Sequence, residues 1–202
     1  MELQRLARLS DLIFAVAMTL MALTFDPLPL KEMTAQEITG FLKEQLPSFG
    51  SYIFTFIAIS FYWTSHLHQF KHYKQTDTIH LWLVLLSLLF VVFLPYANDL
   101  LNFYDSVSAI QVFYSLSVGG VGIFATAAWI YATQNRRLVD PELSDQTIRK
   151  VRQESYAEPL VALLAIGGAL IHPFGWTVTF FVGLPLVFIV QAVAQKKIQP
   201  SP

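Results

Sequence analysis

The sequence contains no cysteine, which excludes disulfide bonds, thiol catalysis and cysteine-ligated metal sites. Charge is also scarce. Asp, Glu, Lys and Arg make up 13% of the chain, and the net charge is -1 at pH 7. A chain without an excess of basic residues lacks the positive surface on which binding to nucleic acid depends. We therefore expect no nucleic-acid partner.

Apolar residues are abundant instead. Hydrophobic types make up 54% of the 202 residues, 17 of them are Phe, and the mean hydropathy is +0.51. Runs long enough to cross the ~30 Å hydrocarbon core of a bilayer recur along the whole chain. We expect an all-α integral membrane protein with residues 1–202 in one domain. A cleavable signal peptide is not expected, because Asp11 lies near the start of the first run.

The apolar runs predict six transmembrane helices, at about residues 5–28, 48–70, 78–101, 109–133, 160–171 and 176–193. Thr34, with Glu37 three residues later, predicts the start of a short interfacial helix over 33–46. In the fourth span, small residues recur every three or four positions, which favours close contact with another helix; they are Ser115, Gly119, Gly122 and Thr126.

The distribution of basic residues predicts how the chain is oriented. Residues 135–158 form a polar stretch in which Ser144 begins a helix that enters the membrane near Pro159, and His172-Pro173 turns the chain into the last span. With six spans, eleven of the thirteen Lys and Arg residues fall on the side of the termini. We therefore expect a multi-pass protein of the cell membrane with both termini cytoplasmic.

The first apolar run, 5–28, has the most specialised pattern. At helical spacing one narrow stripe is formed by Leu9, Leu12, Val16, Leu20, Leu23 and Pro27. Thr19 lies at its edge, and Asp11 lies on a neighbouring face with Ala15 and Ala22, where another helix could approach closely. An apolar stripe on a helix usually packs into a core, so the pattern alone does not assign a function.

Asp11 lies near the membrane boundary, where a carboxylate needs a partner. Arg8 is one turn away, and His66 or His80 on later spans are the other candidates. Alternatively, Arg5, Arg8 and Asp11 are ordinary anchors at the membrane surface.

Catalytic and metal-binding interpretations have little support. His68 and His72 are one helical turn apart, but no carboxylate cluster completes a metal site. Three glycines, Gly119, Gly120 and Gly122, lie inside an apolar span, where they indicate helix packing and not a phosphate loop. We expect neither an enzyme nor a metal site.

The motif Arg5-x-x-x-Leu9-Ser10-Asp11 resembles the R-x-x-x-F-S-D signature of the endosomal and lysosomal potassium channel family, transmembrane protein 175, and its prokaryotic relatives. Residues 13–20 are similar to the continuation of that helix. Trp63-x-x-His66 and Leu94-Pro95-Tyr96 also resemble family patterns, less specifically. Leu9 replaces the family's Phe, so an aromatic packing role at this position does not carry over.

The resemblance implies a homotetrameric potassium channel in which the first helices line a central pore. The family's apolar constriction corresponds to Val16, Leu20 and Leu23, and Thr19 would offer an oxygen to potassium ions. Ser10 and Asp11 would hold the first helix to its neighbours, and a polar packing network would comprise Arg8, Trp63, His66 and His80. No TVGYG-like filter occurs, so selectivity cannot come from a cage of backbone carbonyls.

Other functions remain open. Asp26 is either a cation-concentrating residue at the pore mouth or a solvated residue beside Pro27. A proton-permeable channel of the same fold, a secondary transporter, or a non-conducting adaptor that binds a partner through 135–158 are alternatives to a potassium channel. A transporter is less favoured because the middles of the spans are nearly free of charge. No cofactor is expected beyond the permeant potassium ion.

Overall fold

Helices make up most of the chain in the computed structural model, which describes residues 3–25, 32–183, 185–186 and 189. The α-helices are α1 (Leu3–Leu20), α2 (Ala35–Glu44), α3 (Leu46–Phe70), α4 (Thr78–Phe103), α5 (Ser108–Thr133), α6 (Asp145–Ile171) and α7 (Pro173–Val178). Short 3-10 segments follow α1 at Met21–Thr24 and α5 at Gln134–Arg136, and a π-helical segment at Thr179–Gly183 follows α7.

Five helical segments are long and apolar enough to cross a membrane: Leu3–Leu23, Leu46–Phe70, Thr78–Phe103, Ser108–Arg136 and Asp145–Ile171. Their positions agree with the first five predicted spans. The predicted sixth span, 176–193, is described only in part, as the shorter apolar helix Phe174–Gly183. The chain is therefore a multi-pass helical membrane protein.

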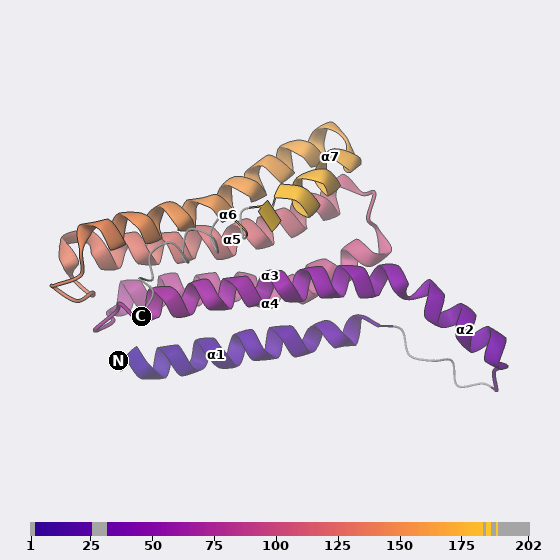
Figure 1. The fold of residues 1–202 in the computed structure, drawn as a ribbon, viewed down its shortest axis with the longest axis horizontal. Helices are drawn as coiled ribbons and strands as arrows, with labels where there is room; N and C mark the ends of the chain where they lie inside the picture. Colours follow the sequence, from indigo (N-terminus) through magenta and orange to yellow (C-terminus); the bar gives the residue numbers. More distant parts are fainter. Residues whose placement is uncertain (1–2, 26–31, 184, 187–188, 190–202) are drawn as a thin grey trace, which may run out of the picture.

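The long helices run side by side in a bundle (Figure 1). Helix α1 packs on α3 and α4, α4 also packs on α5, and α5 packs along α6. The N-terminus shares one end of the bundle with the α3–α4 and α5–α6 connections. The opposite end holds the α4–α5 and α6–α7 connections, and α2 projects beyond it. This arrangement leaves α1 at the edge of the bundle.

The small-residue stripe of α5 lies against α6 and α7, as predicted. A Cβ atom added to Gly122 would lie 2.8 Å from Cδ of Pro159, and one added to Gly119 would lie 3.0 Å from Cβ of Ala162. The side chains of this stripe also bond across the contact, since the hydroxyl of Thr126 donates to the carbonyl of Ser155 at 2.9 Å. Close approach of the two backbones explains why glycine is used here.

The first helix differs from the prediction. Its α-helical part ends at Leu20, a 3-10 turn continues to Thr24, and Phe25 is extended. Tightening of the last turn is common at the C-terminal ends of helices. The extended backbone of Phe25 is followed by Asp26 and Pro27, and Pro27 cannot donate a helical hydrogen bond. The rest of the predicted span, 26–28, lies outside the described residues.

Both predicted helix starts are confirmed. Thr34 and Glu37 form a reciprocal capping box at the start of α2, and Ser144 caps α6 by accepting from the amide of Thr147. Helix α6 continues through Pro159 without a break in its assignment, and His172 caps α7 after the predicted turn. Side-chain caps at these positions satisfy amides that the first turn leaves unpaired.

The two connections at the N-terminal end of the bundle are joined to each other. The amide of Lys74 donates to the carbonyl of Leu138 at 2.8 Å, and the Lys74 ammonium lies 3.0 Å from a carboxylate oxygen of Asp140. The backbone amide of Glu142 and the Lys74 side chain both hydrogen-bond the Asp140 carboxylate, which lowers its pKa. These contacts hold the α3–α4 and α5–α6 connections together.

Candidate functional site

One face of α1 is buried against the rest of the bundle. Its residues recur at helical spacing and are at most 2% exposed: Leu6, Ser10, Phe14, Ala17 and Met21. Ser10 donates to the carbonyl of Leu6 at 2.9 Å, so its hydroxyl is satisfied within the helix. The ring of Phe14 lies 5.5 Å from that of His66 on α3. This buried face is the one that packs on α3 and α4.

A second face of α1 is also apolar, and the described residues do not cover it. We call it the α1 open face; its residues are Leu9, Leu12, Val16, Leu20 and Leu23, which are 39 to 78% exposed. They are five of the six members of the predicted stripe, and the sixth, Pro27, lies outside the described residues. A helix that is apolar on two faces needs a second apolar environment.

The 3-10 turn keeps Leu23 in line with Leu20. In a 3-10 helix, residues three apart eclipse each other, whereas in an α-helix they are offset by about 60°. Leu20 lies directly before the turn Met21–Thr24, which includes Leu23. The two side chains therefore belong to the same side of the helix.

Thr19 has an exposed hydroxyl at the edge of this face. Its Oγ1 donates to the carbonyl of Val16 at 2.9 Å. Because the hydrogen is used within the helix, the oxygen lone pairs are left to accept or to coordinate a cation.

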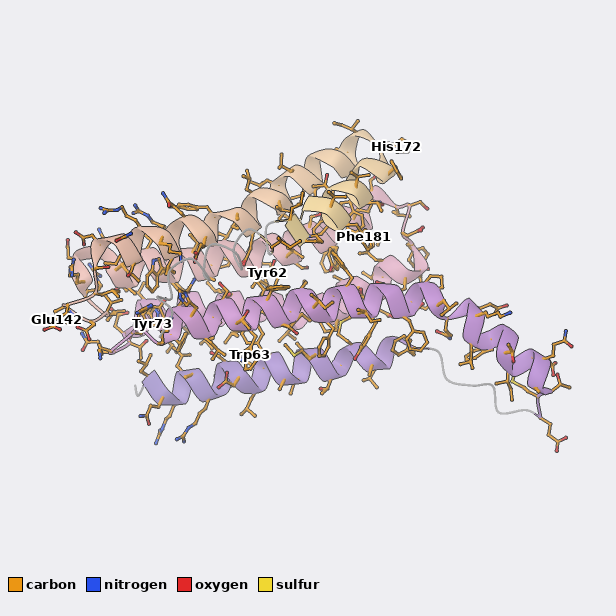
Figure 2. All side chains as sticks on the ribbon, viewed as in Figure 1. Tyr62, Trp63, Tyr73, Glu142, His172 and Phe181 are labelled. Atoms are coloured by element: carbon orange, nitrogen blue, oxygen red, sulfur yellow. The ribbon has the colours of Figure 1, made fainter. Side chains whose placement is uncertain are left out.

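Asp11 accepts a hydrogen bond from the indole nitrogen of Trp63 at 2.9 Å, which joins α1 to α3. Trp63 belongs to the predicted polar network, and Figure 2 shows its side chain at the contact between these two helices.

His66 stacks on Phe70 with the ring centres 4.1 Å apart. Arg5 and Arg8 are exposed near the start of α1.

His80 has its hydrogen-bond partner at the start of α4. It is fully buried, and its Nδ1 lies 2.9 Å from the hydroxyl of Thr76. The structure therefore brings Asp11 and Trp63 together and gives His80 a partner of its own at the start of α4.

Two regions near α1 complete its surroundings. A shallow apolar groove of about 160 Å³ is formed by α1 residues including Leu12, Val16 and Leu20, together with Val92 of α4. At the other end, the ring of Phe25 lies 4.4 Å from Phe49 and 5.2 Å from Tyr52 of α3. Asp26, the predicted mouth residue, lies outside the described residues.

The histidines do not gather into a metal-binding cluster. His68 and His72 contact each other edge to face with ring centres 5.7 Å apart. Within the described ranges, no group of three or more His, Asp or Glu side chains is placed to hold a metal ion. His72 lies just beyond α3. Its pKa is lowered mainly by partial burial and also by the nearby positive charge of Lys71.

A polar network between α3, α4 and α5 was not predicted. Asn98 Oδ1 accepts from the hydroxyl of Ser51 at 2.6 Å and from that of Thr55 at 2.8 Å. Thr55 is in turn 2.9 Å from the hydroxyl of Tyr114. The only signal in the sequence is a polar residue, Asn98, near the end of an apolar run, and that signal does not identify its partners.

The fold and the α1 open face define a class: multi-pass helical membrane proteins whose first helix has an apolar face that the described residues leave exposed. Comparison with known proteins narrows this class. The family model for the endosomal/lysosomal potassium channel TMEM175 matches residues 5–95, which include most of α1, all of α2 and α3, and most of α4.

Two bacterial relatives are similar in sequence. A potassium channel of Streptomyces collinus is 28% identical over 158 residues, which are 75% of this chain and 74% of the relative. A potassium channel of a Chryseobacterium species is 32% identical over 97 residues, which are 47% of this chain and 46% of the relative.

Two solved structures share the fold. The crystal structure of a lysosomal potassium-selective channel TMEM175 homolog from Chamaesiphon minutus matches with a TM-score of 0.80 at 20% identity, over 94% of this chain and 97% of that one. A variant of the potassium channel MtTMEM175, in complex with a nanobody fusion protein, matches with a TM-score of 0.67 at 15% identity, over 95% and 93% of the two chains. The chain therefore resembles this family in sequence over residues 5–95 and shares the fold of the two solved structures.

Proposed function

We infer that this chain is a potassium channel, not an enzyme, and we propose that its pore lies on the α1 open face. The observation that carries this proposal is that α1 presents a second apolar face, from Leu9 to Leu23, which the described residues leave exposed. Two relatives are potassium channels, which supports potassium as the permeant ion. We propose that four copies place their α1 open faces around a common axis, because one helix cannot enclose a pore.

Within that assembly, Val16, Leu20 and Leu23 would form the constriction. Rings of apolar side chains gate by dewetting, because a narrow apolar neck loses its water column unless it widens. Val16 is smaller than leucine, so Leu20 or Leu23 is expected to be at least as tight. Thr19 would offer an oxygen to a partly dehydrated potassium ion, and Asp26 would attract cations at the mouth. Conduction of this kind is passive and requires no cofactor.

The signature residues Arg5, Leu9, Ser10 and Asp11 are proposed to position the helix and not to bind ions. The Asp11–Trp63 hydrogen bond and the burial of Ser10 support this role. Arg8, His66 and His80 are proposed to add to the polar packing at the same end of the bundle.

We propose six spans, with the last running through 176–193, and cytoplasmic termini. The excess of Lys and Arg at the N-terminal end of the bundle supports this orientation, because basic residues favour the cytoplasmic side. The basic residues at this end include Lys74 and those that follow α5. With an odd number of spans, one group of these residues would face outward.

The test is ion flux from purified protein in potassium-loaded liposomes, with sodium substituted for potassium in a second set. Leu20→Ala and Leu23→Ala are expected either to raise potassium flux about tenfold or to reduce the preference for potassium. A tenfold rise corresponds to a barrier that is lower by only about 1.4 kcal/mol. Leu164→Ala is the matched control, because Leu164 is 60% exposed on α6, away from α1.

The outcomes separate the alternatives. Equal effects of all three substitutions would place the pore elsewhere. Proton flux without potassium flux would favour the proton-permeable channel. No flux from folded tetramers would leave a secondary transporter or a non-conducting adaptor.

A further inference from the structure

A cavity of about 380 Å³ lies at the end of the bundle opposite the N-terminus, between α3, α4, α5 and α7. It does not include any residue of α1, so it is separate from the proposed pore. Its volume falls within the range of small-molecule sites, about 300 to 1,000 Å³. It is therefore large enough for a compact organic molecule.

The cavity contains two amide donors that need a partner. Asn98 is fully buried, and its Oδ1 is occupied by the hydroxyls of Ser51 and Thr55. Its Nδ2, and that of Asn102 one helical turn later, are buried without a hydrogen-bond partner in the described part of the chain. Both residues line the cavity. A buried donor without an acceptor is costly, at about 1 to 3 kcal/mol, so the pair favours an occupant that carries an acceptor oxygen.

The remaining lining selects against charge. Among the described residues that line the cavity none is Lys or Arg, and Asp105 lies at its edge, so an anion has no counter-charge. A cation would meet the two buried amide donors, and the carboxylate in the lining, that of Asp105, belongs to an exposed residue. Part of the lining is aromatic and includes Phe54, Trp176 and Phe181. In Figure 2, Phe181 lies where α7 meets the bundle, and its ring centre is 4.6 Å from that of Phe54.

We propose that this cavity binds an uncharged molecule in which a carbonyl oxygen is joined to an aromatic or short apolar group. The carbonyl accepts from Asn98 and Asn102, and the apolar group packs on Phe54, Trp176 and Phe181. A soluble amide and the ester group of a neutral lipid share this chemistry. This proposal does not depend on ion conduction.

The absence of cysteine allows a direct test by thiol protection in liposomes. Ser48→Cys places a thiol among the lining residues but outside the Asn98 network. Gly50→Cys is the matched control, because Gly50 lies on the same helix end, outside the lining, with open space at its Cβ position. The measurement is the rate of reaction with a small thiosulfonate reagent. The soluble probe is acetanilide, and ethylbenzene is the matched compound without an acceptor.

Acetanilide is expected to slow the modification of Ser48→Cys at least fivefold, with no effect on Gly50→Cys and none from ethylbenzene. Adding Asn102→Leu, which removes one donor at similar size, is expected to raise the half-protecting concentration about tenfold, the equivalent of about 1.4 kcal/mol. Protection by dioleoylglycerol in the membrane, but not by acetanilide, would support the same chemistry with a lipid source. Equal protection by ethylbenzene, indifference to Asn102→Leu, or no protection by either carbonyl compound would overturn the proposal.

Discussion

Thr19 gives the sharpest residue-scale prediction about selectivity. Thr19→Val keeps the shape of the side chain but removes the oxygen that is proposed to meet potassium. We expect the preference for potassium over sodium to fall about fivefold, corresponding to about 1 kcal/mol for one lost polar contact. The measurement is the reversal potential in mixed potassium and sodium solutions.

Thr64→Val is a suitable control for that change. Thr64 is also exposed, and its hydroxyl donates to a carbonyl three residues earlier at 2.9 Å, as that of Thr19 does. It lies on α3 and not on the α1 open face. Equal loss of selectivity in both variants would mean that the Thr19 oxygen has no special role.

Substitution of Trp63 tests how the signature residue Asp11 holds α1 in place. Trp63→Phe removes the donor to Asp11, and we expect it to destabilise the folded protein by about 1 kcal/mol, the usual size of one hydrogen bond. Thermal unfolding in detergent measures the effect. The loss should be absent when Asp11 has already been changed to Ala, because the two residues act through one bond. Additive losses in the double variant would show that Trp63 contributes by packing alone.

Helix bounds were the part of the fold most accessible from sequence. The starts and ends of α3, α4 and α5 lie within two residues of the prediction, because long apolar runs are bounded by polar or helix-breaking residues. The end of α1 was predicted too late, since hydropathy does not distinguish an α-helical turn from a 3-10 turn.

Side-chain partners were less accessible. The residues of the α1 open face follow from helical spacing, but their exposure depends on what the other helices cover. The bonds from Asn98 to Ser51 and Thr55 join residues more than forty positions apart, and no local pattern encodes such a pairing.

The α5–α6 contact gives an element-scale prediction. Gly122→Ala would place a methyl group 2.8 Å from Pro159 and 3.2 Å from Glu158, so the helices must separate. Overpacking of this kind costs about 1 to 3 kcal/mol, which thermal unfolding would detect. Gly50→Ala meets open space and should change the unfolding temperature little or raise it. If the two substitutions had the same effect, close packing at Gly122 would not limit stability.

At the scale of the whole molecule, the proposed assembly predicts which helix faces its copies. Leu20→Cys, in a chain that has no other cysteine, should be joined between copies by a short bifunctional thiol reagent. Leu164→Cys on α6 should be joined far less, although it is more exposed than Leu20. Denaturing gels would show linked chains. Preferential linkage through Leu164→Cys would contradict a central position for α1.

The 3-10 turn after α1 also sets how long the narrow part of the proposed pore would be. Three residues rise about 6 Å in a 3-10 helix but only about 4.5 Å in an α-helix. Leu20 and Leu23 would therefore bound a neck about two water molecules long, taking a water radius of about 1.4 Å. Its walls would be stacked leucines with Thr19 just before them. An ion crossing that distance would give up its hydration in one short step near a single hydroxyl.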